Sequence, residues 1–486
     1  MRLKRRQFMH LGGGLLSSLG LGCEGGQKVG PTPDPEPDPD AGKPWWLRGN
    51  FGPVDESEAS ALEVTGSIPA SLEGMFLRNG PNPYFGESGH WFLGDGMVHG
   101  LRLGGGEASL YRARYVQTPV LGVDPAMDDG TVKPPSLTDH EANTSVVHHA
   151  GKLLALLEIG LPYELSKSDL STVGVYDFGG ALNGSMTAHP KVDPVTGEMF
   201  FIGYDVLGPY LTSHVVDATG ALVRSEVIDV PAPAMMHDFQ ITESAVIFMF
   251  LPIIFSLDLA FEGDPFPFRW DPSQGARIGV MPRDGGNADV EWFDVEPCYV
   301  FHTFNAFDDP TTPGKVILDA VRYPQLWVES SEDFDAVGEN WRWELTAGVG
   351  VTEGPWSASG GEFPRIDPRR QGRPYRYGYT TTAMTDAGLG DGVNPADTIA
   401  KYDVEAGTVE HHTLPDGMRM GEAVFIPASD TAAEDEGFLV GYTYHPTRKK
   451  SELVIVDARD LAAPPVARVA LPTRVPYGFH GIWIPS

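Results

Sequence analysis

Short apolar runs separated by glycine and proline recur along the chain from Trp45 to the C-terminus. They are rich in Val, Ile, Phe and Tyr, and each is bounded by Gly, Pro, Asp or Asn, which predicts β-strands rather than helices. Many short strands at hairpin spacing favour a sandwich, a barrel or a propeller. The clearest predicted strands are residues 152–157, 199–204, 245–250, 437–442 and 452–456.

Composition supports an all-β chain with one large domain. The 58 Gly and 42 Pro suit turns and not helix interiors, and no second low-complexity linker or charge block interrupts residues 45–486. A seven-bladed β-propeller needs roughly 50 to 65 residues per blade, which about 440 residues supply. The arithmetic fits, although no repeat is visible as self-similarity.

Charge and cysteine content exclude several classes of site. A formal net charge of −31 would repel a phosphate backbone, so nucleic acid is not an expected partner. Only two cysteines are present, Cys23 and Cys298, which excludes a disulfide framework and a cysteine-based zinc site.

The first 22 residues are typical of an export signal. Arg5 and Arg6 lie in a basic start, and residues 11–22 carry no charge but are too short to span a bilayer. The order Arg5-Arg6-Gln7-Phe8 resembles the twin-arginine signal, whose pathway carries proteins that have already folded. We therefore expect an exported protein, either periplasmic or anchored to a membrane.

Residues 23–44 predict an anchor and a spacer. The sequence before Cys23 resembles a lipoprotein processing site, although Gly20 stands where such sites usually have Leu. The acidic proline repeat at 31–40 has nothing to bury and suits a semi-rigid linker. The alternative is that Cys23 merely ends an ordinary cleaved signal.

Four of the fourteen histidines are candidate metal ligands, because each opens or closes a strand-like segment. Their separations of 48, 65 and 178 residues equal about one, one and three blades, so their side chains would meet on the axis of a propeller. A lone histidine is more often a packed core residue than a ligand. The four are His189, His237, His302 and His480.

The contexts of these histidines resemble those of the carotenoid cleavage oxygenase family, which includes retinal pigment epithelial membrane protein, apocarotenoid oxygenases and lignostilbene dioxygenases. The similarity extends through residues 77–83, 90–99, 142–145 and 474–481, in the family's order. It implies a seven-bladed propeller with a cap of loops and short helices over the metal site. It also implies that the four histidines bind one Fe²⁺ per chain, whereas His90 and His99 only pack or form hydrogen bonds.

The same resemblance assigns roles around the metal. Four neutral imidazoles leave the full charge on iron and two octahedral positions open, so carboxylates are expected behind the ligands, where they fix ring orientation. Glu158, Glu362 and Glu422 occupy those stations, and Thr144 matches a residue beside the open position. The alternatives are surface glutamates and an ordinary strand threonine.

The implied reaction is cleavage of a C=C bond in a carotenoid or apocarotenoid with O2, giving two carbonyl products. Leu157 stands where stilbene-cleaving members have a Lys that engages a phenol, which disfavours hydroxystilbenes unless Tyr115 or Lys133 supplies a partner. The alternatives are a lignostilbene dioxygenase, an isomerase or hydrolase of retinoid esters that consumes no O2, and a non-oxygenase metal-binding propeller lipoprotein. Oxygen uptake separates them.

Three apolar stretches are expected to contribute to a substrate tunnel or to an apolar rim over the propeller, although any of them would ordinarily be core. Such a rim, together with a lipid on Cys23, would favour membrane association. The stretches are residues 160–163, 250–255 and 265–270.

Overall fold

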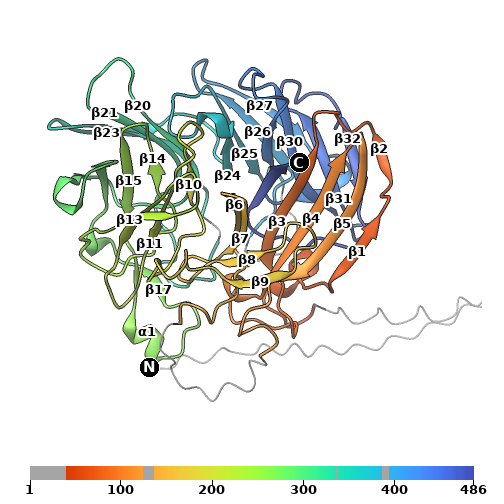
Figure 1. Ribbon diagram of the computed structural model, residues 1–486, viewed down its shortest axis with the longest axis horizontal. Helices are drawn as coiled ribbons and strands as arrows, with labels where there is room; N and C mark the ends of the chain where they lie inside the picture. Colours follow the sequence, from red (N-terminus) through yellow and green to blue (C-terminus); the bar gives the residue numbers. More distant parts are fainter. Residues whose placement is uncertain (1–39, 124–135, 335, 386–392) are drawn as a thin grey trace, which may run out of the picture. The chain divides into compact units, whose positions relative to one another are not determined.

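The computed structural model describes residues 40–123, 136–334, 336–385 and 393–486. Within these ranges, residues 42–486 form one compact unit that is almost entirely β-sheet. Seven antiparallel sheets follow one another around a ring as the blades of a β-propeller (Figure 1). The predicted fold class is therefore confirmed.

The first four blades, each named from its innermost strand outward, contain the metal-facing strands β33, β10 and β14. They are β33 (Gly481–Pro485), β3 (Gly74–Pro81), β4 (Gly96–Gly104), β5 (Glu107–Tyr115) and β1 (Ser57–Ser60); β6 (Ser145–His149), β7 (Lys152–Leu156), β8 (Tyr163–Leu165) and β9 (Thr172–Val175); β10 (Lys191–Val192), β11 (Met199–Gly203), β12 (Thr212–Val216) and β13 (Leu222–Val227); and β14 (Gln240–Ile241), β15 (Ala245–Phe250), β18 (Arg277–Pro282) and β19 (Glu291–Asp294).

The remaining three blades complete the ring. They are β20 (Tyr299–Asp308), β21 (Lys315–Tyr323), β22 (Glu339–Thr346) and β23 (Gly350–Pro355); β24 (Glu362–Ile366), β25 (Tyr377–Thr382), β26 (Thr398–Asp403) and β27 (Thr408–Thr413); and β28 (Arg419–Met420) with β29 (Val424–Pro427), β30 (Gly437–His445), β31 (Lys450–Asp457), β32 (Ala467–Ala470) and β2 (Val64–Gly66). All five strands predicted from apolar runs are present, as β7, β11, β15, β30 and β31.

The two ends of the described chain close the ring. The C-terminal strand β33 pairs with β3, with Gly481 opposite Arg78, while the N-terminal strand β2 joins the last blade, with Val64 opposite Val469. Each closure joins segments about 400 residues apart, so the blade that carries β33 is held from both sides. This fixes the segment around His480 against the rest of the ring.

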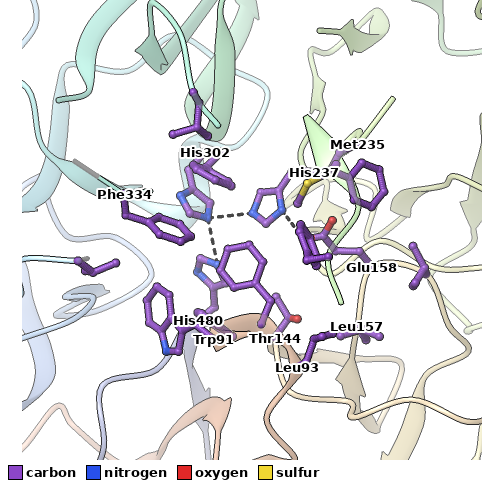
Figure 2. Close-up of a pocket in the computed structure, with 18 of the residues that line it drawn as sticks. Trp91, Leu93, Thr144, Leu157, Glu158, Met235, His237, His302, Phe334 and His480 are labelled. Atoms are coloured by element: carbon purple, nitrogen blue, oxygen red, sulfur yellow. Dashed lines mark hydrogen bonds and ion pairs between the residues drawn. The ribbon is translucent and has the colours of Figure 1, made fainter. Parts of the chain in front are cut away.

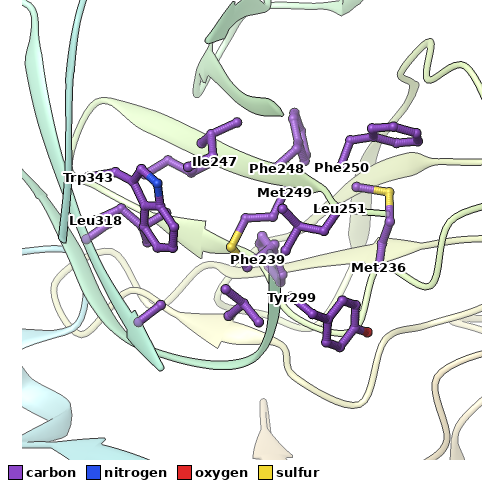
Figure 3. Packing of buried hydrophobic residues seen from close by; sticks show 14 of the residues in the cluster. Met236, Phe239, Ile247, Phe248, Met249, Phe250, Leu251, Tyr299, Leu318 and Trp343 are labelled. Atoms are coloured by element: carbon purple, nitrogen blue, oxygen red, sulfur yellow. The ribbon is translucent and has the colours of Figure 1, made fainter. Parts of the chain in front are cut away.

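Apolar packing between blades explains why some strands are apolar without alternation. All six residues of β15 are buried, because neighbouring blades cover both faces of the strand (Figure 3). Ile247 and Phe248 belong to a cluster that continues to Leu318 and Trp343 of the next blade.

A cap interrupts the fourth blade between β15 and β18. It contains the hairpin of β16 (Ile253–Phe255) and β17 (Phe268–Trp270) and the helix α1 (Leu257–Phe261), which begins after Ser256, whose hydroxyl accepts from the amide of Leu259. The residues described contain no helix long and apolar enough to cross a membrane.

Candidate metal centre

The four predicted histidines converge at the ends of four innermost strands. His189, His237 and His480 stand just before β10, β14 and β33, and His302 lies within β20. The Nε2 atoms of His189 and His237 are 3.0 Å apart, those of His237 and His302 are 3.3 Å apart, and those of His302 and His480 are 3.1 Å apart. All four potential ligand atoms lie within 4.8 Å of one another.

Three glutamates contact the outward nitrogens of three of these rings. Nδ1 of His302 is 2.6 Å from Glu362, Nδ1 of His480 is 3.1 Å from Glu422, and Nδ1 of His237 contacts Glu158 (Figure 2). A carboxylate accepts a proton, so each contact fixes the N–H on Nδ1 and leaves the Nε2 lone pair facing inward. The arrangement places each predicted glutamate behind one predicted ligand.

This donor set fits a metal ion. Inward-facing lone pairs about 3 Å apart repel one another, and a cation among them would turn that repulsion into coordination. Four imidazoles without a carboxylate ligand are suited to a divalent first-row metal. The cluster is the only group of three or more His, Cys, Asp or Glu side chains with this geometry in the part of the chain that the structure describes.

The electrostatics of the site favour metal binding. Burial, with the neighbouring imidazoles, lowers the pKa of His189 well below its usual value, and burial lowers the pKa of His480 to about 4 despite Glu422. Burial also acts to raise the pKa of Glu422, but Arg365 and His480 outweigh it and lower that pKa to about 2. The result is neutral imidazoles backed by an ionised carboxylate, as metal binding requires.

Each glutamate is held by a further donor that sequence analysis did not identify. The hydroxyl of Tyr204 donates to Glu158 at 2.6 Å, and that of Tyr323 donates to Glu362 at 2.7 Å. Nε of Arg365 donates to Glu422 at 2.8 Å. Tyr204 ends a run that the sequence identified only as a strand, so its chemistry left no local signal.

Asp238 ties three of the inner strands together. Its Oδ1 pairs with Nζ of Lys191 on β10 at 2.7 Å, and its Oδ2 accepts from the amide of Thr303 on β20 at 2.9 Å. Asp238 follows His237, Lys191 lies two residues after His189, and Thr303 follows His302. One carboxylate therefore sets the spacing of three ligands, a role that the sequence did not predict.

Thr144 lies beside the metal centre, where its backbone carbonyl accepts from the amide of His480 at 3.2 Å. Its hydroxyl donates to Asn143 at 3.0 Å, and its side chain lines the cavity described below. The position agrees with that of a residue flanking an open coordination site, and the role stays a prediction.

His90 and His99 are held by ordinary hydrogen bonds, as expected. Nε2 of His90 is 3.0 Å from the carbonyl of Ser331, and Nδ1 of His99 is 2.8 Å from the hydroxyl of Tyr111.

A cavity of about 1240 Å³ opens onto His237, His302 and His480. Its walls include Phe92, Phe301 and Phe334, whose rings pack edge to face around it (Figure 2). Leu157 also lines this cavity, as the substrate argument requires. The space is large enough for an extended apolar molecule and lies directly over the imidazoles.

The three predicted tunnel stretches have different fates. Residues 160–163 are buried between strands and do not line the cavity, and in residues 250–255 only Phe255 does. In residues 265–270, positions 265–268 line it. Burial against a neighbouring blade and exposure to an apolar cavity require the same side chains, which is why the sequence could not separate these stretches.

Apolar side chains surround the opening of the cavity. Leu207, Phe261 and Val337 line it and are 69%, 75% and 79% exposed, respectively. An exposed apolar cluster at a cavity mouth is typical of an entrance for an apolar ligand or of a contact surface.

Other predicted residues lie elsewhere. Tyr115 is not among the cavity walls, because its hydroxyl contacts Asn82 and its ring packs on Tyr84. Lys133, Cys23, the export signal at 1–22 and most of the linker at 23–44 lie outside the described residues.

Comparisons with known proteins agree with this geometry. A sequence profile described as "Retinal pigment epithelial membrane protein" matches residues 51–485. A carotenoid cleavage oxygenase of Mycobacterium tuberculosis is 36% identical over 91% of this chain and 97% of its own length. Among solved structures, Pseudomonas brassicacearum lignostilbene dioxygenase superposes with a TM-score of 0.82 at 29% identity, covering 91% of this chain and 99% of that one.

Cobalt-substituted Synechocystis apocarotenoid oxygenase superposes with a TM-score of 0.78 at 30% identity, covering 91% of this chain and 98% of that one. Sequence, fold and the four-histidine cluster thus agree. The chain belongs to the retinal pigment epithelial membrane protein family of carotenoid cleavage oxygenases, and it is an oxygenase enzyme.

Proposed function

We propose that this protein is a non-haem iron(II) oxygenase that cleaves a C=C bond of a carotenoid or apocarotenoid with O2, giving two carbonyl products. The observation that carries the proposal is the convergence of four Nε2 atoms beside an apolar cavity of about 1240 Å³. The histidines would hold one Fe²⁺, which supplies O2 activation when bound. The cavity would hold the polyene and set which double bond faces the metal.

The residues around the metal would orient and exclude rather than transfer protons. Glu158, Glu362 and Glu422 fix the directions of three imidazoles, so the geometry at the metal does not depend on the substrate. Thr144 narrows the wall beside His480. The aromatic walls keep water away from the reacting bond.

The nature of the cavity wall supports a carotenoid-type substrate over a hydroxystilbene. Leu157 cannot accept or donate a hydrogen bond, and a phenolate buried against it would be strongly destabilised. Of the two alternative partners, Tyr115 lies elsewhere, and Lys133 is outside the described residues. The similarity to a lignostilbene dioxygenase keeps stilbene cleavage as the second candidate.

Mass spectrometry of products from an apocarotenoid panel under ¹⁸O2 tests the reaction. Two carbonyl products, with labelled oxygen and matching O2 uptake, are expected. Turnover without O2 uptake would instead assign isomerisation or ester hydrolysis. A metal-loaded protein that binds but converts nothing would favour a non-oxygenase metal-binding lipoprotein.

We also propose export to the periplasm or to a membrane-anchored state through the twin-arginine-like signal at 1–22 and a lipid on Cys23. The basic start, the short uncharged segment and the proline-rich linker support this, and the exposed apolar mouth would suit a membrane surface. Arg5→Lys with Arg6→Lys should block export, and Cys23→Ser should release the protein from membranes. Fractionation reads both; wild-type protein in the cytoplasm would contradict export, and soluble periplasmic wild type would contradict only the anchor.

A further inference from the structure

Glu141 places a carboxyl group in the cavity wall that the proposed reaction does not use. The residue lines the same cavity as Thr144 and Leu157. Among the described residues, its carboxyl meets only its own backbone N–H as a hydrogen-bond donor. A carboxyl group without a partner in an apolar wall is costly, so it invites an explanation from function.

The other carboxyl groups of the cavity already have partners. Glu158 and Glu362 support histidines, Oδ1 of Asp205 accepts from the amide of Leu207, and Asp139 accepts from the hydroxyl of Thr138. Glu141 therefore differs from its neighbours in keeping its hydrogen-bonding capacity free for a ligand.

The backbone around Glu141 is firmly held. Asn143 donates to the carbonyls of Phe92 and Gly94 at 2.8 and 2.7 Å, and the amide of Gly96 donates to the carbonyl of Glu141 at 2.9 Å. Ala142 between them has φ 48°, a left-handed conformation that costs energy for a residue with a Cβ. The side chain of Glu141 is thus presented from a fixed turn and not from a loose loop.

The surroundings of the carboxyl group suit hydrogen bonding to a neutral group. Burial, with a smaller contribution from Asp95, raises the pKa of Glu141 to about 7. The group therefore resists a full negative charge near neutral pH. In either protonation state it has an oxygen that can accept from a hydroxyl.

We propose that Glu141 binds a hydroxyl on the end group of the polyene, so the enzyme selects hydroxylated over purely hydrocarbon-ended apocarotenoids. This rests on the proposed function and narrows its substrate class. Glu141 and Thr144 are three residues apart, so their Cα atoms are at most about 11 Å apart. The hydroxyl would anchor one end of the substrate in the cavity while a double bond further along the chain faces the metal centre.

The test compares a 3-hydroxy-β-apocarotenal with the same apocarotenal lacking the hydroxyl. Anaerobic binding, followed by quenching of tryptophan fluorescence, measures affinity without turnover. Wild type should bind the hydroxylated compound about tenfold more tightly, and Glu141→Leu should abolish that preference while leaving the affinity for the other compound within about twofold. Glu141→Gln, which keeps a hydrogen-bonding side chain of the same shape, should retain most of the preference.

Glu107→Leu is the matched control, because Glu107 is an exposed glutamate in β5 and its loss changes net charge equally. It should leave the preference unchanged. Equal binding of the two compounds by wild type, or an unchanged preference in Glu141→Leu, would overturn the inference. Failure of the proposed reaction appears separately, as preferential binding without O2-dependent cleavage once air is admitted.

Discussion

The metal centre and the cavity that opens onto it are built by different means. At the centre, His302 and His480 are each fixed by a strand and by a glutamate 2.6 or 3.1 Å away. In the cavity, Phe334 is held by ring contacts with Trp45, Trp91 and Trp327 from separate segments. Directional hydrogen bonds fix each ligand individually, whereas apolar walls are defined only by their combined packing.

This difference has a functional consequence. A change at the centre should remove chemistry, because no neighbouring group can replace a lost ligand. A change in the wall should leave the chemistry and alter the choice of substrate, since apolar walls tolerate substitutions of similar volume.

The largest effect is expected at the histidines. Replacing His189, His237, His302 or His480 with Ala should remove most of the bound iron and lower activity by at least about 100-fold. Metal analysis alongside kcat measures both, and His411→Ala, at an exposed histidine of β27, is the control. Full activity in iron-free protein, or zinc in active preparations, would contradict the assignment.

Substrate choice tests the cavity wall. Turnover of a 4-hydroxystilbene should be slower than that of an apocarotenoid by at least about 100-fold, because Leu157 gives the phenol no partner. Leu157→Lys should narrow the gap from the stilbene side. Both substrates are assayed on one iron-loaded preparation, and efficient stilbene cleavage without apocarotenoid cleavage would reverse the substrate assignment.

The glutamates behind the ligands should show intermediate effects. Glu158→Gln, Glu362→Gln and Glu422→Gln should keep the fold and lower metal affinity or rate by roughly 10 to 100-fold, since an amide is a weaker acceptor for the Nδ1–H. Glu410→Gln, at an exposed position of β27, serves as the comparison. Wild-type metal affinity and kinetics in all three variants would show that the carboxylates do not support the ligands.

The smallest effect is expected in the aromatic wall. Phe334→Ala removes ring contacts worth about 1 kcal/mol, so KM should rise about fivefold while iron content stays unchanged. Steady-state kinetics with parallel metal analysis separates the two. Loss of iron in this variant would mean that the wall and the centre are not independent.

Much of the fold and the centre could be predicted from the sequence. The apolar runs identified β7, β11, β15, β30 and β31, and the blade arithmetic agreed with seven sheets. The motifs around His189, His237, His302 and His480 identified the cluster, because each ligand stands at a strand end with a recognisable local context. The three glutamates were also identified, but not which ring each would contact.

Only the tertiary structure decided the remainder. The sequence could not predict that Tyr204 and Tyr323 support glutamates 46 and 39 residues away, or that Asp238 joins three strands. It could not place residues 265–268 in the cavity and 160–163 in the core. The sequence alone determined which residues alternate, turn or carry ligand chemistry, because those are local properties. Contacts between distant segments depend on how the ring closes, and an apolar side chain has the same pattern whether it faces a neighbouring blade or an empty cavity.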